Sequence, residues 1–331
     1  MKKIIIGIDV SKLKLDVGHY TSEGRVKSNC VVIENNTTGY NDMLTWFKKK
    51  KFKIKDILIC MEHTGIYTDQ LTKFLEKKKI PYTLQSPLHL SKSLGIVRGK
   101  DDAIDAFRLS EYADEKKGKI KVSKRAPENQ IRLKQLASER KQAVYALAKV
   151  RQIKTEIAVH QKASSRNRKE KQIVLLKKII SDIENEIQSV IESDNELLKN
   201  YKLMLSINGI GPVNAYSTII FTRNFTLFPD ARSYACYVAV APFPHQSGSS
   251  IHKKTSVSKI GNHYLKAILG QAARSAIIHD PQIRKYFNRK FNGKKGPDSN
   301  YGQVLNAIKF KLICRMFAVI KRQTPYISLD F

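Results

Sequence analysis

The chain has 331 residues, with 60 lysines and arginines against 29 aspartates and glutamates, so its formal net charge is +31. This length supplies enough apolar side chains for two or three domains with real cores, which excludes general disorder. The basic excess is spread along the whole chain. We therefore expect a partner of dense negative charge, and nucleic acid fits best because each neutralised phosphate releases counterions.

Two further features narrow the class of protein. No long apolar run, lipidation signal or secretory segment stands out, so we expect no membrane partner and a soluble cytoplasmic protein. The cysteines are far apart and form no C-x-x-C pair, which excludes a zinc ribbon or a disulfide framework and indicates buried thiols. They are Cys30, Cys60, Cys236 and Cys314.

The first 120 residues alternate between strand and helix patterns. A short strand meander leads into β-α units, which predicts a mixed sheet covered by helices. We expect this α/β domain to span 1–120. The predicted elements are strands 4–10, 14–20 and 25–33, helix 37–50, strand 56–61, helix 67–79, strand 81–85 and helix 101–116.

The composition changes over 121–200, where no glycine occurs and no proline follows Pro127 up to residue 200. Two long helical patterns are separated by the polar run 162–169. Together they predict an antiparallel helical arm with helices of roughly 50 Å at about 1.5 Å per residue. The second helix is indicated by apolar residues at a spacing of three and four, interrupted by Asp194. These residues are Ile173, Leu176, Ile180, Ile183, Ile187, Val190 and Leu197.

Residues 201–331 predict a mainly α-helical C-terminal domain, because glycines and prolines return and punctuate short helical patterns. The run Ile207–Pro212, followed by a helical pattern, is typical of a helix-hairpin-helix element. Gly209 and Gly211 in this run are candidate nucleic-acid-binding residues, because glycine lets backbone N–H groups approach a phosphate.

Four carboxylates form the candidate active site. Asp9 ends an isoleucine-rich strand, and Glu62 stands at the same place on a second strand. Asp102 and Asp105 lie three residues apart at the start of a predicted helix, so both face one side. Hard oxygen ligands select Mg²⁺ or Mn²⁺, and two such ions support in-line displacement at a phosphodiester. Taken singly, each acid also suits a turn, a helix cap or a surface ion pair.

Three motifs resemble the IS110 family of insertion-sequence transposases, which are related to the Piv-type DNA invertases. The motifs are Ile8-Asp9-Val10-Ser11-Lys12, Glu62-His63-Thr64-Gly65-Ile66-Tyr67 and Lys100-Asp101-Asp102-Ala103-Ile104-Asp105-Ala106. The resemblance implies an N-terminal RuvC-like (RNase H-like) nuclease domain with a D, E, D, D tetrad.

Carried over by position, the tetrad is Asp9, Glu62, Asp102 and Asp105. The family usually has threonine where this chain has Asp101, so Asp101 and Asp102 compete for the third ligand. Helical spacing leaves both open, since Asp101 and Asp105 also share a face, and the family register favours Asp102. Arg98 and Lys100, just before this motif, are candidate phosphate contacts.

The resemblance continues through the C-terminal half, from Phe225 to Leu312. It includes Ser247-Gly248 and the motif that contains Lys259, a further candidate nucleic-acid contact. Ser247 is implied as the covalent nucleophile, in a run that by itself is typical of a flexible loop. Ala239 stands where the family prefers glycine, a change expected to tighten the backbone slightly.

The resemblance also implies further partners. These are DNA, a structured guide RNA, and other copies of the chain in a dimer or tetramer. Because the predicted arm separates the two sites, we expect Ser247 of one subunit to complete the acidic site of another.

Several alternatives remain open on the sequence. A Piv-type invertase would use the same residues on inverted sites. A junction-resolving nuclease would need the acids but not Ser247, and a structural nucleic-acid binder would need neither. A tyrosine recombinase is disfavoured, because no Arg and His-x-x-Arg constellation is present.

Overall fold

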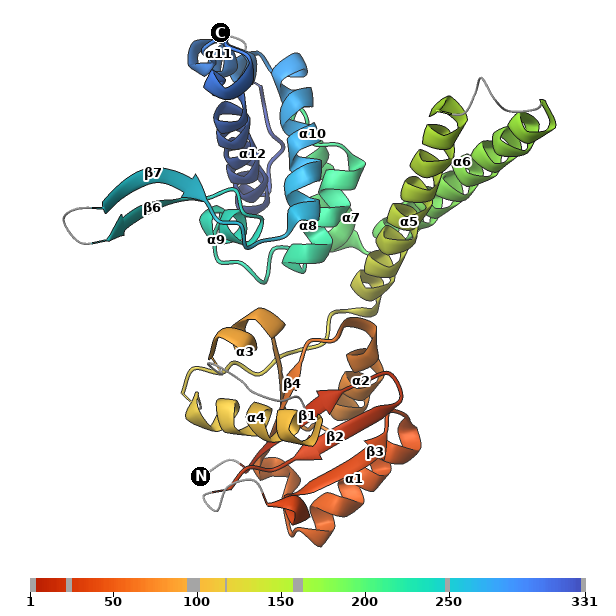
Figure 1. Cartoon of the computed structure of the whole chain (residues 1–331), viewed down its shortest axis with the longest axis vertical. Coiled ribbons are helices and arrows are strands. Elements are labelled where there is room, and N and C mark those ends of the chain that lie inside the picture. The colour runs from red at the N-terminus through yellow and green to blue at the C-terminus, as the bar shows by residue number, and fades with distance from the viewer. Residues whose placement is uncertain are drawn as a thin grey trace. The chain divides into compact units, whose positions relative to one another are not determined.

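The computed structural model describes residues 4–21, 26–93, 102–116, 118–156, 163–247 and 251–328. A few side chains within these ranges, including those of Asp102 and Ser247, lie outside the description. The chain divides into two compact units, Met1–Arg125 and Ala126–Phe331. Figure 1 labels the elements of both.

The N-terminal unit contains a mixed five-stranded sheet in the order β3-β2-β1-β4-β5. The β1, β2 and β3 strands are antiparallel neighbours, whereas β4 runs parallel to both β1 and β5. This arrangement confirms the predicted meander followed by β-α units. The strands are β1 (Ile4–Val10), β2 (Lys14–Gly18), β3 (Cys30–Glu34), β4 (Ile57–Glu62) and β5 (Tyr82–Gln85).

One face of this sheet packs against α1 (Thr37–Lys49) and α2 (Asp69–Lys77). Alternation along each strand sends every second apolar side chain to this side, which forms the larger core of the unit. The buried side chains from the strands include Ile6, Ile8, Leu15, Val17, Ile57, Ile59, Met61 and Tyr82.

The other face is covered by α4 (Asp102–Glu115), with α3 (Pro87–Ser93) beside it. A smaller core forms there, from Ile5 and Cys60 on the sheet and from Leu90 and Leu109 on the helices. The short α3 helix was not predicted, since seven residues carry too little periodic pattern to identify a helix.

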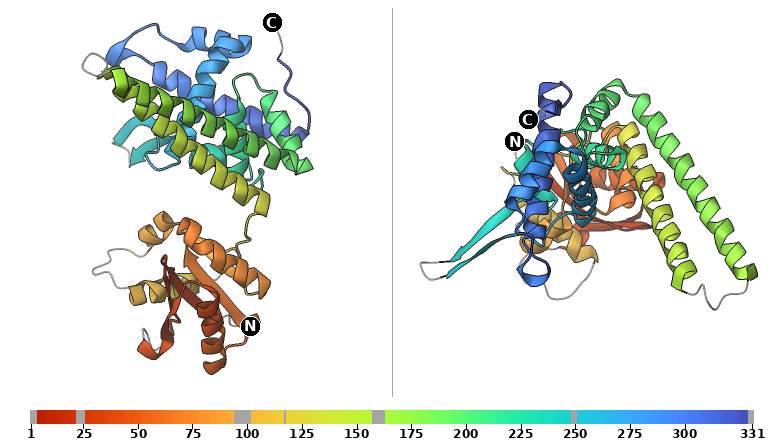
Figure 2. Two further views of the ribbon diagram at one scale, coloured as in Figure 1. Left: turned by 90° about the vertical axis from the view of Figure 1, so that its right-hand side faces the viewer. Right: turned by 90° about the horizontal axis from the view of Figure 1, so that it is seen from above.

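The C-terminal unit begins with the helical arm, formed by α5 (Glu128–Glu156) and α6 (Ala163–Glu192), which pack against each other (Figure 2). Their 29 and 30 residues correspond to about 45 Å each. Ion pairs from Arg132 to Glu186 and from Arg140 to Glu184 join the two helices. The base of the arm belongs to the C-terminal core, where Leu133 and Ile191 are fully buried.

Two details of the predicted arm are corrected. The polar run 162–169 does not separate the helices, because α6 already begins at Ala163. The second helix does not reach Leu197 either, since Asp194 accepts hydrogen bonds from the backbone N–H groups of Glu196 and Leu197 and caps a new helix, α7 (Asn195–Leu205). Asp194, the polar residue that interrupts the apolar pattern, is thus the N-cap of a new helix.

The rest of this unit is a helical body around one core, in which α12 packs against α7, α9, α10 and α11. A two-stranded hairpin, which the sequence did not predict, extends from this body as β6 (Pro242–Ser247) and β7 (Ile251–Val257). The helices are α7, α8 (Pro212–Thr222), α9 (Ala231–Tyr237), α10 (His263–His279), α11 (Pro281–Lys290) and α12 (Tyr301–Arg322). Over the described ranges, none of the helices has the length and apolar content to cross a membrane.

Candidate active site and nucleic-acid interface

Asp9 and Glu62 lie next to each other at the carboxyl ends of two neighbouring strands. Ile8 of β1 is paired with Met61 of β4 in a parallel register, and the two acids are the next residue on each strand. Since Ile8 and Met61 face the larger core, both acids point to the opposite face, toward the side that α4 covers. Adjacent strands are about 4.8 Å apart, so the two side chains leave the sheet as immediate neighbours. Both residues are partly exposed.

Helix α4 is held against β1 by an unusually close backbone approach. A Cβ atom placed on Gly7 would lie only 1.9 Å from the carbonyl oxygen of Ala106, so only glycine fits there. One helical turn later, the Ser110 hydroxyl donates a hydrogen bond of 2.8 Å to the carbonyl oxygen of Ile5. These contacts mean that α4 and β1 run in opposite directions.

The same contacts set the level of the helix start relative to the strand. Four helical residues rise about 6 Å and two strand residues about 6.6 Å, so the spacings match. Gly7 lies against the turn between the Ala106 carbonyl and the Ser110 N–H, and Ile5 lies against the Ser110 hydroxyl, so the first turn of α4 lies near the level of Asp9. The start of α4 therefore lies over the strand ends that carry Asp9 and Glu62.

Asp105 is partly exposed and paired with Arg108, whose guanidinium nitrogen lies 2.7 Å from the carboxylate. This ion pair orients the Asp105 side chain one turn along from Asp102. The side chain of Asp102 and the whole of Asp101 lie outside the described residues, so the choice between them remains a prediction from the family register.

Asp16 is an acid that the sequence reasoning missed. It is paired with Asp9 across the antiparallel β1-β2 ladder, so it shares the face of Asp9. It is 4% exposed, and its carboxylate lies 3.4 Å from the Lys14 ammonium. The alternation of Leu15 and Val17, both in the core, was the available signal, because it assigns Asp16 to the Asp9 face.

The carboxylates suit a divalent metal ion in ligand type and in strand register. Among the described side chains, no three His, Cys, Asp or Glu residues already form a cluster able to hold a metal. The side chain of Asp102, in the first turn of α4, lies outside the described residues. The described contribution to the site is therefore the Asp9 and Glu62 pair, with Asp105 nearby on α4.

Ser247 is the last residue of β6, where it pairs with Ile251 of β7. It was predicted in a loop, whereas its backbone belongs to the last residue of a strand. The side chain of Ser247 and the residues 248–250, which include Ser249 and Ser250, lie outside the description. The hairpin extends from the helical body in Figures 1 and 2.

The predicted nucleic-acid contacts fall in different environments. Gly209 has a φ of +95°, and a Cβ there would lie 2.7 Å from the Ala272 carbonyl oxygen of α10, so this glycine serves close packing inside the unit. Gly211 precedes α8 and has open space around its Cα. Lys259 is exposed next to the hairpin. Arg98 and Lys100 lie outside the described residues.

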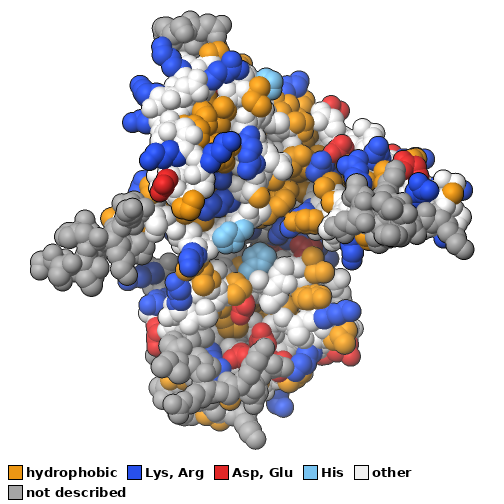
Figure 3. All heavy atoms as spheres, turned by 45° about the horizontal axis from the view of Figure 1, so that its top comes forward, with side chains coloured by type: hydrophobic (Ala, Val, Ile, Leu, Met, Phe, Trp, Pro, Cys, Tyr) orange, Lys and Arg blue, Asp and Glu red, His pale blue; other side chains and the backbone are white. Residues whose placement is uncertain are grey.

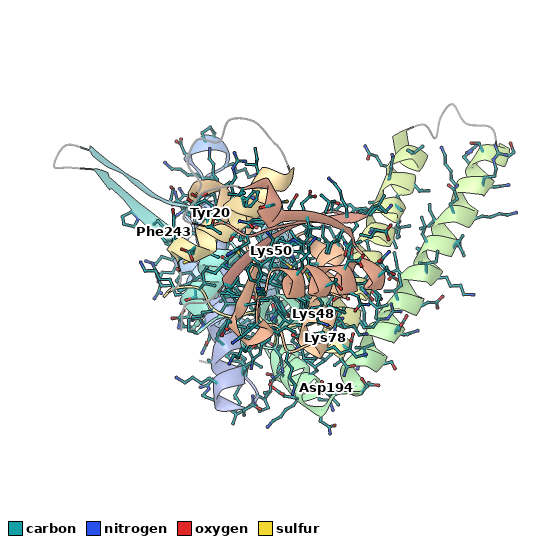
Figure 4. The ribbon with its side chains drawn as sticks, turned by 90° about the horizontal axis from the view of Figure 1, so that it is seen from below. Tyr20, Lys48, Lys50, Lys78, Asp194 and Phe243 are labelled. Carbon is teal, nitrogen blue, oxygen red and sulfur yellow. The ribbon has the colours of Figure 1, made fainter. Side chains whose placement is uncertain are left out.

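A lysine-rich surface lies at the end of the N-terminal sheet opposite Asp9 and Glu62. Helices α1 and α2 both end there, immediately before the residues that lead into β4 and β5. Each helix is followed by a lysine of positive φ, Lys51 at +58° and Lys79 at +55°, which reverses the chain. Figure 4 labels three lysines of this surface, Lys48, Lys50 and Lys78. Lysines near a helix C-terminus interact favourably with the helix dipole. Several lysines at one end of the sheet also favour binding of a polyanion.

Buried tyrosines of the helical unit are poorly suited to attack a phosphate. Desolvation by burial raises the pKa of Tyr201, Tyr216 and Tyr234. A phenol with a raised pKa is a weaker source of phenolate, so these three tyrosines are poor candidates for a nucleophile.

Comparisons with known proteins place both halves of the chain in one family. A transposase model of the DEDD type from IS110 elements matches residues 6–157, and the model of the Transposase IS116/IS110/IS902 family matches residues 201–288. The first of these matches contains Asp9, Glu62, Asp102 and Asp105. Transposase domains of this type generally use divalent metals, and carboxylates such as those at the strand ends suit such ions.

Similar proteins include the pilin gene-inverting proteins of Moraxella bovis and Moraxella lacunata. Each is 27% identical to this chain over 98% of both lengths. A probable family 20 transposase of Pseudomonas aeruginosa is 26% identical over 30% of this chain and 28% of its own. These matches are to enzymes of DNA rearrangement, and together with the two family models they show that the chain belongs to the IS110 family of transposases.

Proposed function

We propose that this transposase cleaves and rejoins DNA with an acidic site in a RuvC-like N-terminal domain and a serine on the C-terminal hairpin. The observation that carries the proposal is the meeting of Asp9 and Glu62 at adjacent strand ends beneath the start of α4. A pair of carboxylates on a part-exposed sheet edge, in a chain of net charge +31, suits chemistry on a phosphodiester.

The residues assigned to the metal site are Asp9, Glu62, Asp102 and Asp105. Bound Mg²⁺ or Mn²⁺ would stabilise negative charge on the attacking and leaving oxygens of a phosphodiester. The chain's own contribution is to fix the carboxylates. Gly7 permits α4 to approach β1, and Arg108 orients Asp105.

Ser247 is proposed as the nucleophile. Its Oγ attacks the DNA phosphorus, and the bond from Oγ to phosphorus forms as the bond from phosphorus to a deoxyribose oxygen breaks. The serine loses one proton, and the displaced oxygen gains one. A hydroxyl of the incoming strand then attacks the phosphoserine, so the serine leaves and recovers its proton. The phosphodiester is remade without hydrolysis.

The proposed assembly contains more than one copy of the chain. Ser247 of one subunit completes the acidic site of another, and a structured guide RNA selects the DNA. The basic charge of both units supports a nucleic-acid partner of either kind.

Inversion is the second candidate outcome of the same chemistry. It is supported by the two pilin gene-inverting relatives, which align over nearly the full length. A plasmid that carries two candidate sites in inverted orientation distinguishes the outcomes, because inversion keeps all DNA in one circle whereas transposition joins the element to a new site. Sequencing of RNA that purifies with the protein tests the guide.

The experiment that tests the nucleophile traps the covalent protein-DNA adduct. We expect Ser247→Ala to abolish the adduct and the recombined product, while the matched control Ser249→Ala retains both. Mixing inactive Asp9→Ala with inactive Ser247→Ala protein should restore some product through composite sites. An adduct that persists in Ser247→Ala would exclude this serine as the nucleophile.

A further inference from the structure

The helical body of the C-terminal unit is depleted of acids. Between Ala231 and Arg322 the sequence contains only two acidic residues, Asp280 and Asp298. Asp280 is fully buried and paired with Arg315, so it is not available to other cations. Figure 3 shows blue lysine and arginine side chains over much of the visible face, with fewer red ones. Cations in this body therefore have few acids with which to pair.

Three of these cations converge where α10 packs against α12. Lys266 and Arg274 lie four residues before and four residues after Gly270 on α10, so all three positions share one face of the helix. Lys309 of α12 lies over the glycine between them. A Cβ on Gly270 would be 3.4 Å from its Cε and 3.5 Å from its ammonium nitrogen. Gly270 thus leaves space for the Lys309 side chain between Lys266 and Arg274.

The arrangement is unfavourable for the protein alone. Burial lowers the pKa of Lys309, and the positive charges of Lys266 and Arg274 lower this pKa further. Helices α10 and α12 contain no aspartate or glutamate. Within the described part of the chain, no ion pair involves any of the three cations. Three like charges are kept together without an acid, and the central one, Lys309, is partly desolvated, so we infer that the compensating charge comes from a ligand.

We propose that Lys266, Lys309 and Arg274 form a row that binds the phosphodiester backbone of a nucleic acid. The row spans eight helical residues, about 12 Å. One strand of duplex DNA carries a phosphate per about 3.4 Å of axis, so a row of this length is long enough for each of its three cations to meet a separate phosphate. A backbone fits better than a single small anion, because three separate cations are spread along one line.

The position of the row relates it to the proposed serine. Lys266 is four residues after Asn262, the N-cap of α10, and the N–H of Asn262 bonds to the carbonyl oxygen of Tyr237. On α12, Asn306 donates to the carbonyl oxygen of Val240, two residues before the hairpin begins. A strand bound along the row would therefore approach the base of the hairpin that carries Ser247. In this respect the inference rests on the proposed function.

The test compares two triple variants of the full-length protein in fluorescence anisotropy with labelled duplex DNA and, separately, with labelled structured RNA. One variant combines Lys266→Gln, Arg274→Gln and Lys309→Gln. The matched control combines Lys199→Gln, Lys285→Gln and Lys321→Gln, three exposed lysines of the same unit. Both variants lose the same net charge, so they differ only in where the charge is lost.

For the row variant, we expect the slope of log affinity against log salt on duplex DNA to become shallower by about 2.7, with a loss on structured RNA if RNA occupies the row. The control should lose less than about one. If the salt slope changes for only one of the two probes, that probe identifies whether DNA or RNA occupies the row. Equal slopes for the two variants on both probes overturn the proposal.

A second variant separates binding from folding. Lys309→Met keeps the aliphatic stem over Gly270 but removes the charge, so we expect the melting temperature to rise while nucleic-acid affinity falls. A lower melting temperature with unchanged affinity would show that Lys309 is structural and overturn the proposal. The wild-type protein serves as the reference for the slopes and melting temperatures. If wild-type protein fails to cleave DNA, the proposed function is wrong. The salt slopes would still show whether the row binds nucleic acid.

Discussion

The two units place their polar groups in opposite ways. In the N-terminal unit, carboxylates stand at the ends of buried strands and a helix closes over them through a glycine contact. In the C-terminal unit, acids are nearly absent beyond residue 230 and cations line helix surfaces. The contrast suggests a division of tasks, in which the sheet edge fixes reacting groups and the helical body holds a polyanion.

Salt dependence tests what the units have in common. With six or more phosphate contacts, DNA affinity should fall roughly 10³-fold or more between about 50 and 200 mM salt, because bound cations release counterions. Anisotropy titrations at several salt concentrations measure this slope. An affinity that stays flat over the range would show that the basic charge of both units serves another purpose.

Neutralising the carboxylates tests whether the N-terminal unit carries out DNA cleavage. Asp9→Asn and Glu62→Gln should each lower the DNA cleavage rate by at least roughly 10²- to 10³-fold, because each change weakens the hold on the metal ion that would stabilise the developing negative charge. DNA affinity should stay close to that of the wild type. The control is Asp56→Asn, just before the opposite end of β4, which should cleave normally. Full cleavage by either site variant would remove the sheet edge from the active site.

The glycine contact tests whether the acidic site depends on backbone packing. Gly7→Ala should destabilise the fold by roughly 3 kcal/mol, at the upper end of the usual cost of overpacking, because its Cβ would collide with the Ala106 carbonyl. The control Gly118→Ala meets no atom within 4 Å and should change stability by less than about 0.5 kcal/mol. Denaturant unfolding measures both. Equal stabilities would mean that α4 is free to shift away from β1.

A smaller effect is expected beside the hairpin. Ala239 has a φ of +54°, in the left-handed region that favours glycine, which explains the family's preference. Ala239→Gly relieves strain but loses a buried methyl group and gains freedom in the unfolded chain, so stability should rise by only about 0.5 kcal/mol. Ala235→Gly, inside α9, should instead lower stability by about 1 kcal/mol. Thermal melts compare the two variants. A lower stability of Ala239→Gly would show that Ala239 is not strained in the wild-type protein.

Local pattern determined much of the N-terminal unit in advance. The β1 strand has the predicted bounds, and the mixed sheet with Asp9 and Glu62 at its strand ends follows from runs of apolar residues. Such runs are readable because a buried strand or helix face repeats every few residues. The family motifs added the tetrad register and Ser247, which local pattern alone left among equivalent acids and serines.

Only the tertiary structure decided which distant residues meet. Asp16 lies on the same face as Asp9 because the two residues are paired across the β1-β2 ladder. Glycine is required at position 7 because Ala106, far away in the sequence, packs directly against it. Lys309 reaches Gly270 only because α12 packs on α10. Contacts of this kind depend on how whole elements pack, and a single sequence carries no periodic signal for the partner of a residue on another element.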